Sequence, residues 1–373
     1  MEKNTINLRL ADLRKAKHIT QSELAEEVGT SFQTISKWEN GITMPDVTVL
    51  PVLASFFEVS VDELLGLKPL QGEIYSVEGT DSDDFWNKHM EYILRSRNES
   101  WNIDYLEFLV NNVWKIDKPV NVLDCGCGYA HLAVMLMPLL PKGSNYTGID
   151  FSSALIEKAE FLVKNNNING KIIKGDFLES NFSNEFDVVI CQSVLRHIGN
   201  PIKFVSKMIS AAKENGLVIC IDTNREIECC GLYIDGMDYG ELCDHSGAIK
   251  HWKAEIANNK RDYAAAMRNA YTMRELGLHN IDVRMNDKVS FVCQEQDDYK
   301  TKVNDFIDTK SLWYDDKNEA IERLVNHGMT KVEAEQYVNK SEKICEYLKK
   351  HDDEVAFTHF KGKTITFGWK RRG

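Results

Sequence analysis

The sequence predicts an α/β chain built on a mostly parallel sheet, preceded by a smaller all-α domain of five short helices. Short apolar segments alternate with helical patterns from residue 120 to residue 221, which is the order of a parallel sheet with crossover helices. A turn containing Gly126 and Gly128 joins the first apolar segment to a helical pattern. Residues 1–68 instead show apolar residues at helical spacing, with capping signals between the successive helical patterns.

The first strand and the turn that follows it predict a site for an adenosine-type cofactor. The strand starts near Val120 and reaches Asp124 just before the glycines, and a helical pattern, 131–140, follows. Glycine lets the backbone turn tightly and pass close to a ligand, where a Cβ would clash. The next strand, 145–149, leads into Asp150, near the offset of roughly 20 residues expected for a carboxylate that binds a ribose diol.

The residues around this turn favour a cationic cofactor over a dinucleotide. A pyrophosphate site has a third glycine three residues after the second, but this chain has His131 there. Asp124 would repel a phosphate group and would attract an amino group. The expected ligand therefore carries a nucleoside and a positive charge.

The turn and the segments after it resemble the ordered motifs of the class I S-adenosylmethionine-dependent methyltransferases, from about residue 86 to 294 and again in the last strand. The third glycine usual in that family is Ala130 here. The matching segments are Val122–Gly128, Asp150-Phe151, Gly175-Asp176-Phe177, Phe186–Gln192, Ser193–Ile198 and a fifth strand at 216–221. The resemblance implies a Rossmann-like methyltransferase sheet, S-adenosyl-L-methionine as the cofactor and a small-molecule methyl acceptor.

The resemblance also implies which residues hold the cofactor. The amino-acid part would bind Asp124 and the backbone at Gly126 and Gly128. The ribose would bind Asp150 beside Phe151, the adenine would contact Asp176 and Phe177, and Gln192 would line the wall. His197 and His245 are candidate general bases, because neutral imidazole accepts a proton near pH 7; both are equally compatible with structural roles.

The first 68 residues resemble the XRE/Cro-like helix-turn-helix family over residues 5–66. The match rests on the segment TQSELAEEVGTSFQTISKWENG, which starts with a capping box at Thr20 and Glu23. In that geometry the helix at 32–40 enters the major groove of DNA. The resemblance then implies base contacts from Gln33, Thr34 and Lys37 and phosphate contacts from Gln21 and Asn40.

The charge of this first segment leaves two hypotheses open. Residues 1–70 carry seven Lys or Arg residues and ten Asp or Glu residues, whereas DNA-binding domains usually present a basic face. One hypothesis is a homodimer that binds a DNA operator, since two half-sites would compensate for weak single contacts. The other is a module that docks protein or forms the dimer.

Breaks in the sequence predict the domain boundaries. Pro69, Gly72 and Gly79 mark a linker at 69–85, between a helix-turn-helix domain at 1–68 and a methyltransferase domain at 86–373. An aromatic-rich segment, 85–114, is expected to be helical. Two insertions, at about 226–270 and 297–350, are expected to form a helical cap or lid over a small or medium-sized substrate, and 357–369 is expected to close the chain as one strand.

Composition and motifs narrow the function. The net charge of −12 disfavours a nucleic-acid substrate, and the fourth strand ends in Ile190-Cys191-Gln192 without the proline found in DNA-methylating enzymes of either type. DNA methylation is therefore the least favoured hypothesis. The alternative to an enzyme is a transcription regulator that uses the fold to sense S-adenosylmethionine or a metabolite.

Cysteine and hydropathy patterns point to the cytoplasm and to no metal. The nine cysteines show no disulfide-framework spacing, and the sequence lacks both a signal peptide and an apolar run of membrane-spanning length. The first insertion contains Cys229, Cys230, Cys243, His245 and His251, but at no zinc-finger spacing.

Overall fold

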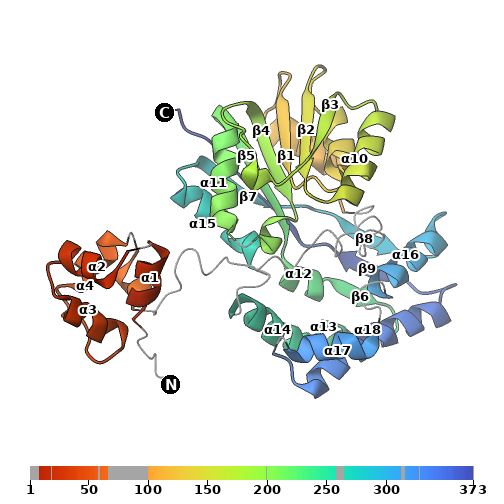
Figure 1. The fold of residues 1–373 in the computed structure, drawn as a ribbon. Coiled ribbons are helices and arrows are strands. Elements are labelled where there is room, and N and C mark those ends of the chain that lie inside the picture. The colour runs from red at the N-terminus through yellow and green to blue at the C-terminus, as the bar shows by residue number, and fades with distance from the viewer. Residues whose placement is uncertain are drawn as a thin grey trace. The chain divides into compact units, whose positions relative to one another are not determined.

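The structure, a computed structural model, describes residues 8–17, 19–57, 59–65, 100–198, 200–257, 264–311, 316–326 and 328–372. The chain divides into two compact units, Met1–Ser76 and Val77–Gly373, and each is considered by itself (Figure 1). The predicted linker, 69–85, lies outside the described residues, so its position stays a prediction.

The first unit contains the five predicted short helices. They are α1 (Leu10–Ala16), α2 (Gln21–Glu27), α3 (Phe32–Glu39), α4 (Leu50–Phe56) and α5 (Val61–Leu64). The capping box predicted at Thr20 and Glu23 is formed, and the Ser31 side chain caps α3. The fourth helix begins only at Leu50, because the Asp46 carboxylate accepts hydrogen bonds from the amide and hydroxyl of Thr48 and holds a turn before it.

One hydrophobic core joins these helices. Each of the five helices contributes at least one buried apolar side chain, among them Ile35 and Trp38 on the inner face of α3. This leaves the opposite face of α3, with Phe32, Gln33 and Lys37, exposed.

The second unit is built on a seven-stranded sheet in the order β3-β2-β1-β4-β5-β10-β7. The first five strands of that order are parallel to their neighbours, and β10 is antiparallel to both β5 and β7. The strands are β1 (Asn121–Cys125), β2 (Asn145–Asp150), β3 (Gly170–Lys174), β4 (Phe186–Gln192), β5 (Ala212–Thr223), β7 (His279–Met285) and β10 (Lys363–Trp369). The Rossmann-like α/β prediction is confirmed.

Helices cover both faces of this sheet (Figure 1). Alternate strand residues point to opposite faces, so Val122 joins one core and Leu123 the other. The first core includes residues of α8 (Ile103–Phe108), the π-helical turn η1 (Leu109–Val113), α9 (His131–Leu136) and α10 (Ser153–Asn165). The second includes residues of α11 (Pro201–Ala211) and α15 (Ala265–Glu275).

The two insertions form a cap together with the short strands that flank the second insertion, and this cap contains a second, three-stranded antiparallel sheet, β6-β9-β8. Its strands are β6 (Leu232–Ile234), β8 (Val289–Val292) and β9 (Phe357–Phe360). The cap helices are α12 (Arg225–Cys230), α13 (Tyr239–Cys243), α14 (Ser246–Ala257), α16 (Tyr299–Ser311), α17 (Lys317–Asn326) and α18 (Lys331–Lys350). Because α12 follows β5 directly, the cap begins at the carboxyl edge of the main sheet.

The prediction of a single closing strand at 357–369 was wrong. The segment forms two strands in different sheets, β9 and β10, and the break contains Gly362 in the left-handed region at φ 60°. A side chain at Gly362 would lie 2.9 Å from the Asn224 carbonyl oxygen, so the chain turns closely past the start of α12.

Candidate functional site

Three carboxylates follow one another along the carboxyl edge of the main sheet. Asp124 is in β1, Asp150 ends β2, and Asp176 comes two residues after β3. Since β3, β2 and β1 are parallel neighbours, these acids lie at the same edge. Ligands of open parallel sheets bind at this edge.

The turn after β1 has the backbone geometry that its glycines allow. Gly126, Gly128 and Ala130 all have left-handed φ values, of 74°, 54° and 60°. The amides of Gly126 and Cys127 both donate to the Ile149 carbonyl oxygen, at 2.8 and 3.1 Å. A Cβ at Gly126 would lie 2.7 Å from a methyl carbon of Val194, so glycine is required there for space as well as for conformation.

Asp150 holds this turn in place. One carboxylate oxygen accepts from the Gly128 amide at 2.8 Å, and the other accepts from the Ser152 amide at 3.0 Å. A carboxylate oxygen has two lone pairs, so these bonds leave acceptor capacity for a ribose hydroxyl. The exposed ring of Phe151 is the next residue.

Asp124 is buried beneath the turn, where 2% of its surface is exposed. Its Oδ2 accepts from the Tyr146 hydroxyl at 2.9 Å. Burial, with the charge of Asp124 beside it, raises the pKa of Tyr146 well above its ordinary value. Tyr146 therefore stays a neutral donor and orients the carboxylate.

The two residues predicted to contact adenine lie in different environments. Asp176 is exposed and accepts from the Leu178 amide, which caps a short 3-10 helix, η3 (Phe177–Glu179). Phe177 is buried in the second core, edge-on to Phe204 with ring centroids 4.9 Å apart. The contact of Phe177 with adenine stays a prediction, and the structure shows its ring packed against Phe204.

Gln192 connects the end of β4 to the aromatic segment. Its side-chain oxygen accepts from the Trp101 indole N–H at 3.0 Å, and both residues are buried. Of the expected helical segment at 85–114, the described part begins at Ser100 and includes α8 and η1. Trp101 thus lies beside the predicted cofactor wall.

His197 is in a contact that opposes its predicted role as a base. It lies in the 3-10 helix η4 (Leu195–His197), and the Arg196 Nε donates to its Nε2 at 2.8 Å. Arginine has no acceptor, so the Nε2 lone pair is used and the ring is neutral with its proton on Nδ1. In this arrangement Nε2 of His197 is not available to take a proton from a methyl-acceptor molecule.

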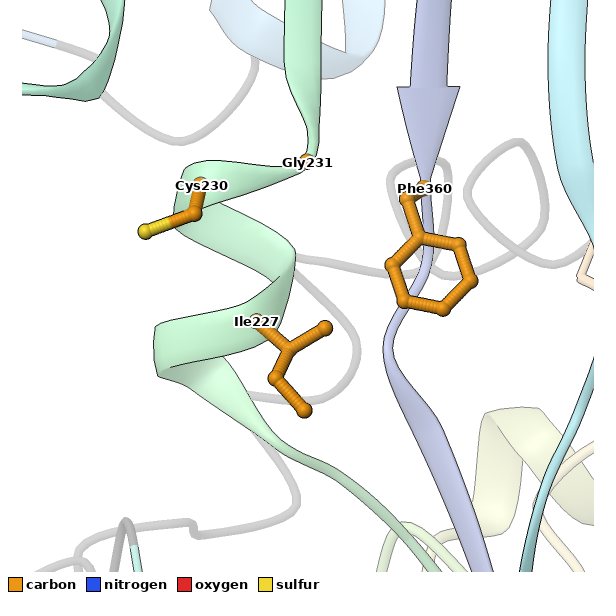
Figure 2. Close-up of a pocket in the computed structure, with 4 residues that line it drawn as sticks. All are labelled: Ile227, Cys230, Gly231 and Phe360. Atoms are coloured by element: carbon orange, nitrogen blue, oxygen red, sulfur yellow. The ribbon is translucent and has the colours of Figure 1, made fainter.

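His245, the other candidate base, lies in the first insertion between α13 and α14. Its Nε2 is 3.8 Å from the Cys230 thiol. Cys230 also borders a pocket of about 310 Å³, together with Ile227, Gly231 and Phe360. Figure 2 shows Ile227 of α12 and Phe360 on either side of this pocket, with the Cys230 sulfur directed away from the Phe360 ring.

Asp222 is a buried carboxyl near the carboxyl edge of the sheet that the sequence analysis did not single out. It follows five buried apolar residues of β5, 217–221, and is 1% exposed. Its Oδ2 accepts from the Asn269 amide of α15 at 2.9 Å. The available signal was an acid directly after a fully apolar strand, at the edge where the other site residues lie.

The electrostatic surroundings perturb Asp222 strongly. Burial raises its pKa to about 6, although the Asn269 hydrogen bond and the charges of Arg196 and Lys363 act in the opposite direction. Lys363 is buried in β10, whose next residue, Thr364, is the cross-strand partner of Asp222. Strongly perturbed carboxyls at a sheet edge are typical of functional sites.

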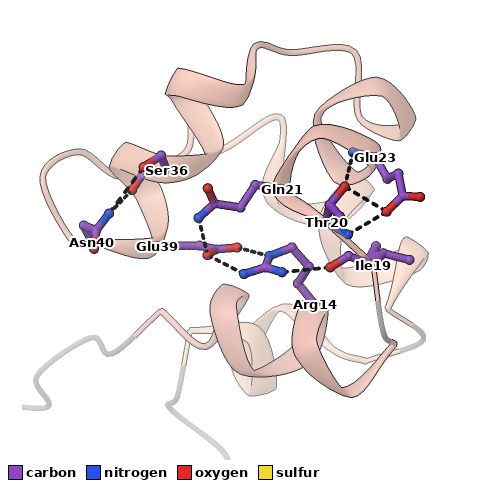
Figure 3. A network of polar contacts seen from close by, with 8 residues as sticks. All are labelled: Arg14, Ile19, Thr20, Gln21, Glu23, Ser36, Glu39 and Asn40. Carbon is purple, nitrogen blue, oxygen red and sulfur yellow. Dashed lines mark hydrogen bonds and ion pairs between the residues drawn. The ribbon is translucent and has the colours of Figure 1, made fainter.

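In the first unit, a polar network links residues of α1 and α2 to α3. The Arg14 guanidinium donates to both Glu39 carboxylate oxygens, at 2.6 and 3.0 Å, and to the Ile19 carbonyl oxygen at 2.7 Å. The Gln21 amide donates to Glu39 at 2.7 Å. Figure 3 shows Glu39 receiving both partners. Gln21, a predicted phosphate contact, is therefore held against α3.

The other predicted DNA contacts lie on or beside α3. Gln33 and Lys37 are exposed and one helical turn apart, while Thr34 is half-buried and its hydroxyl is 2.8 Å from that of Ser31. The Asn40 amide donates back to the Ser36 carbonyl oxygen at 2.7 Å. Gln33 and Lys37 are thus the residues of this set presented most openly.

Within the described part of the chain, no three His, Cys, Asp or Glu side chains are grouped so that they could hold a metal ion. No described helix is both long enough and apolar enough to cross a membrane.

Comparison with known proteins finds similarity in both units. A family model described as "Methyltransferase domain" matches residues 116–280, and a family model described as "Helix-turn-helix" matches residues 10–64. The ubiquinone biosynthesis O-methyltransferase of Rickettsia akari is 31% identical over 204 residues, which are 54% of this chain and 75% of that protein. Its counterpart from Rickettsia bellii is 25% identical over 239 residues, 64% of this chain and 92% of that protein.

Among solved structures, one similar to this chain is an S-adenosylmethionine-dependent methyltransferase from Thiobacillus denitrificans in complex with S-adenosyl-L-homocysteine. It is 14% identical, with a TM-score of 0.39, and the match covers 75% of this chain and 98% of that one.

Proposed function

The chain belongs to the S-adenosylmethionine-dependent methyltransferases, and from this premise we propose that it methylates an oxygen atom of a small or medium-sized molecule. The observation that carries the proposal is the row of acids Asp124, Asp150 and Asp176 at the carboxyl edge of neighbouring strands. Oxygen as the acceptor atom is taken from the relatives, which are named as O-methyltransferases.

The residues present fit the cofactor. A negatively charged edge suits a ligand that carries an ammonium and a sulfonium group and would oppose a phosphate. When bound, S-adenosylmethionine supplies a methyl group on a positively charged sulfur. Asp124 would bind the ammonium group beside the backbone of Gly126 and Gly128, Asp150 would bind the ribose, and Asp176 the adenine amino group.

Other residues would shape the site around the bound groups. Phe151, whose ring is 44% exposed, would lie against the ribose. Gln192, oriented by Trp101, would form the wall next to the reacting methyl group. Excluding water and holding the acceptor oxygen about 3 Å from the methyl carbon would supply much of the rate acceleration.

The acceptor would enter between the main sheet and the cap. The apolar pocket of Ile227, Cys230, Gly231 and Phe360 supports this, because α12 begins three residues after Asp222. A helix of six residues spans roughly 9 Å, so the pocket lies within the length of a small molecule from that strand end. We propose that an apolar part of the acceptor occupies it.

Calorimetry with S-adenosylmethionine tests the cofactor site, with Asp124→Ala as the test variant and Tyr146→Phe as the matched control. The first removes the carboxylate, whereas the second removes only the hydroxyl that orients it. A charge-assisted hydrogen bond contributes about 1.5–3 kcal/mol, so Asp124→Ala should weaken binding by roughly 10- to 100-fold, and Tyr146→Phe by only a few-fold.

Equal affinity in wild type and Asp124→Ala would contradict the assignment of the site. Release of S-adenosylhomocysteine in the presence of acceptor then separates an enzyme from a sensor, since a sensor would bind the cofactor without turnover.

For the first unit, we propose that it binds a DNA operator as part of a homodimer. The exposed positions of Gln33 and Lys37 on α3 support this, as does the match to helix-turn-helix domains. A dimer is the usual form for reading two half-sites. The acidic composition of the first unit distinguishes it from most DNA-binding domains, so the contacts of α3 would have to supply most of the affinity for DNA.

Fluorescence anisotropy on DNA from the upstream region of the protein's own gene tests this proposal. Lys37→Ala should weaken binding; a phosphate contact from this lysine would also show as a decrease of about one in the slope of log K against log salt concentration. Gln33→Ala should remove a base contact, which costs about 1–3 kcal/mol of binding free energy at one position of the DNA sequence. Glu27→Gln, an exposed change on α2, serves as the control. Absence of binding by the wild-type protein at low salt would favour the protein-docking hypothesis.

We propose a cytoplasmic location for the protein. All nine cysteines lie among the described residues, and none of them forms a disulfide there, which is typical of a reducing compartment.

A further inference from the structure

The main sheet has two edges, and one of them is the strand β7. Among the described residues, β7 has β10 as its one neighbouring strand, so the backbone N–H and C=O groups on its other side are open. Figure 1 shows β7 at the end of the sheet opposite to β3. An open edge pairs readily with another strand unless its side chains prevent this.

Two features bound the uninterrupted extended part of β7 at residues 281–285. Just before it, Asn280 has a left-handed φ of 50°, in the region where the register against β10 shifts. Just after it, Asn286 is buried, and its side-chain amide donates to the Ser100 carbonyl oxygen at 2.5 Å. The middle residue of the extended segment is therefore Val283.

The side chains of this segment form two rows on opposite faces of the sheet. Asp282 and Arg284 lie on the face of α8, because their register partners in β10 belong to the first core. The alternate residues, Ile281, Val283 and Met285, lie on the other face, where Ile281 packs against the second core. Val283 is 46% and Met285 38% exposed, so this apolar row continues into solvent.

The segment is complementary to a second copy of itself in the antiparallel direction. With Val283 opposite Val283 of the partner subunit, Asp282 faces the partner's Arg284, and Ile281 faces the partner's Met285. Cross-strand pairs of opposite charge and of apolar side chains stabilise a sheet. Moving the pairing by one residue toward either end would place Asp282 opposite itself or Arg284 opposite itself, so the charges specify this register.

The two edges of the sheet differ in charge. On β3 the charged side chains are Lys171 and Lys174, and lysines on an edge strand are a common protection against pairing. On β7 the segment carries one acid and one base, and the Arg284 Nε donates to the Asp282 Oδ2 at 3.0 Å. The edge at β7 therefore lacks the repulsion that protects the edge at β3.

From these observations we infer that β7 is the contact surface for a second copy of this chain, so that two main sheets join in one antiparallel pairing centred on Val283. The inference goes beyond the proposed methyl transfer and DNA binding, and it depends on neither of them.

The surface beside β7 adds to the area of this contact. A strand of five residues is about 17 Å long, whereas a stable interface buries about 1,200–2,000 Å² in total, so side chains of neighbouring elements are needed as well. Asn102, at the start of α8, donates to the Asp287 carboxylate at 2.8 Å, two residues beyond the end of β7. The next residue, Ile103, is an exposed apolar side chain and is available to the same interface.

Sedimentation equilibrium of the full-length protein tests the inference with two charge reversals, Asp282→Arg and Arg284→Asp. Each single variant has two like charges on the edge and opposes like to like in a self-pair, so its self-association should weaken by about 10- to 100-fold. An equimolar mixture of the two variants opposes two cations to two anions and should associate within a few-fold of wild type. The matched control, Lys171→Asp, reverses an exposed charge on β3 and should change nothing.

The mixture distinguishes a lost contact from a damaged fold, because a misfolded variant would not be rescued by the other. Three results would overturn the inference: a wild type that is monomeric at the highest concentration measured, single variants that associate as well as wild type, or a mixture that stays monomeric when both variants are. The second result would locate any dimer contact elsewhere, as in the first unit.

Hydrogen exchange of the wild-type protein gives a second readout that locates the contact. Backbone amides that become paired between two copies exchange more slowly. Deuterium uptake of the peptide covering 279–286 should therefore decrease as the protein concentration rises, while uptake of the peptide covering 170–175 at the β3 edge should stay constant. Uptake at 279–286 that does not depend on concentration, in a protein that does associate, would also overturn the inference.

Discussion

At the scale of single residues, the carboxyl of Asp222 is an unfavourable choice for stability. It is 1% exposed, and burial raises its pKa to about 6 from an ordinary value of 3.8. A carboxyl whose pKa is raised in the folded state binds protons more tightly there than in the unfolded state. It therefore lowers stability at neutral pH, and this loss disappears as pH falls below 6 toward 3.8.

We predict that Asp222→Asn stabilises the protein at pH 8. The pKa difference corresponds to about 3 kcal/mol, at 1.36 kcal/mol for each pH unit, and an unpaired buried amide would offset part of it. The free energy of unfolding at pH 8 should rise by about 1–2 kcal/mol. Urea unfolding at pH 8 and pH 5 measures this, and a gain that is as large at pH 5 would contradict the charge explanation.

At the scale of secondary-structure elements, α1, α2 and α3 are tied together by one carboxylate. Glu39 at the end of α3 receives Arg14 from α1 and Gln21 from α2, and the side chains of Glu39 and Arg14 are 5% and 13% exposed. Burial alone would raise the pKa of Glu39, but the hydrogen bonds and charges of its partners produce a net decrease. Its stabilising effect is thus present above pH 4.5 and is lost in acid.

We predict that Glu39→Gln destabilises the first unit by about 2–3 kcal/mol at pH 7, because it leaves the Arg14 charge partly buried without its counter-ion. The destabilisation relative to wild type should shrink as pH falls below 4.5, since wild-type Glu39 is then protonated. Circular dichroism of thermal unfolding across this pH range measures it. The exposed change Glu27→Gln is the control, and equal effects of the two substitutions would contradict the prediction.

At the scale of the whole molecule, the chain contains separate hydrophobic cores. Among the described residues, the buried core of the first unit is formed by side chains from Leu10 to Leu64, while the four other clusters lie between Trp101 and Phe367. Cooperative unfolding follows a shared core. The two units should therefore unfold in two transitions.

We predict that S-adenosylmethionine raises the unfolding temperature of the second unit and leaves that of the first unit unchanged. A ligand at 100 times its Kd stabilises the unit that binds it by about 2.7 kcal/mol, or roughly 5–10 °C for a domain of this size. Differential scanning calorimetry with and without the ligand checks this. A shift of both transitions, or a single transition, would indicate that the two units are energetically coupled.

The sequence by itself determined the features that depend on neighbouring residues. The glycine turn, the acids at the carboxyl ends of β1 and β2, the capping box at Thr20 and the five apolar helix faces all follow from local conformation and periodicity. The order of strands and helices was sufficient to predict the fold class, because parallel strands need crossover helices.

The tertiary structure alone decided what each side chain contacts. Phe177 is in the core because Phe204 of α11 packs on it, and the Nε2 of His197 is occupied because Arg196 points at it. Asp222 and Asn269 are 47 residues apart in the chain, and the closing segment divides between two sheets. Such contacts depend on distant parts of the chain meeting in space, and the burial that perturbs Asp222 exists only once they have met.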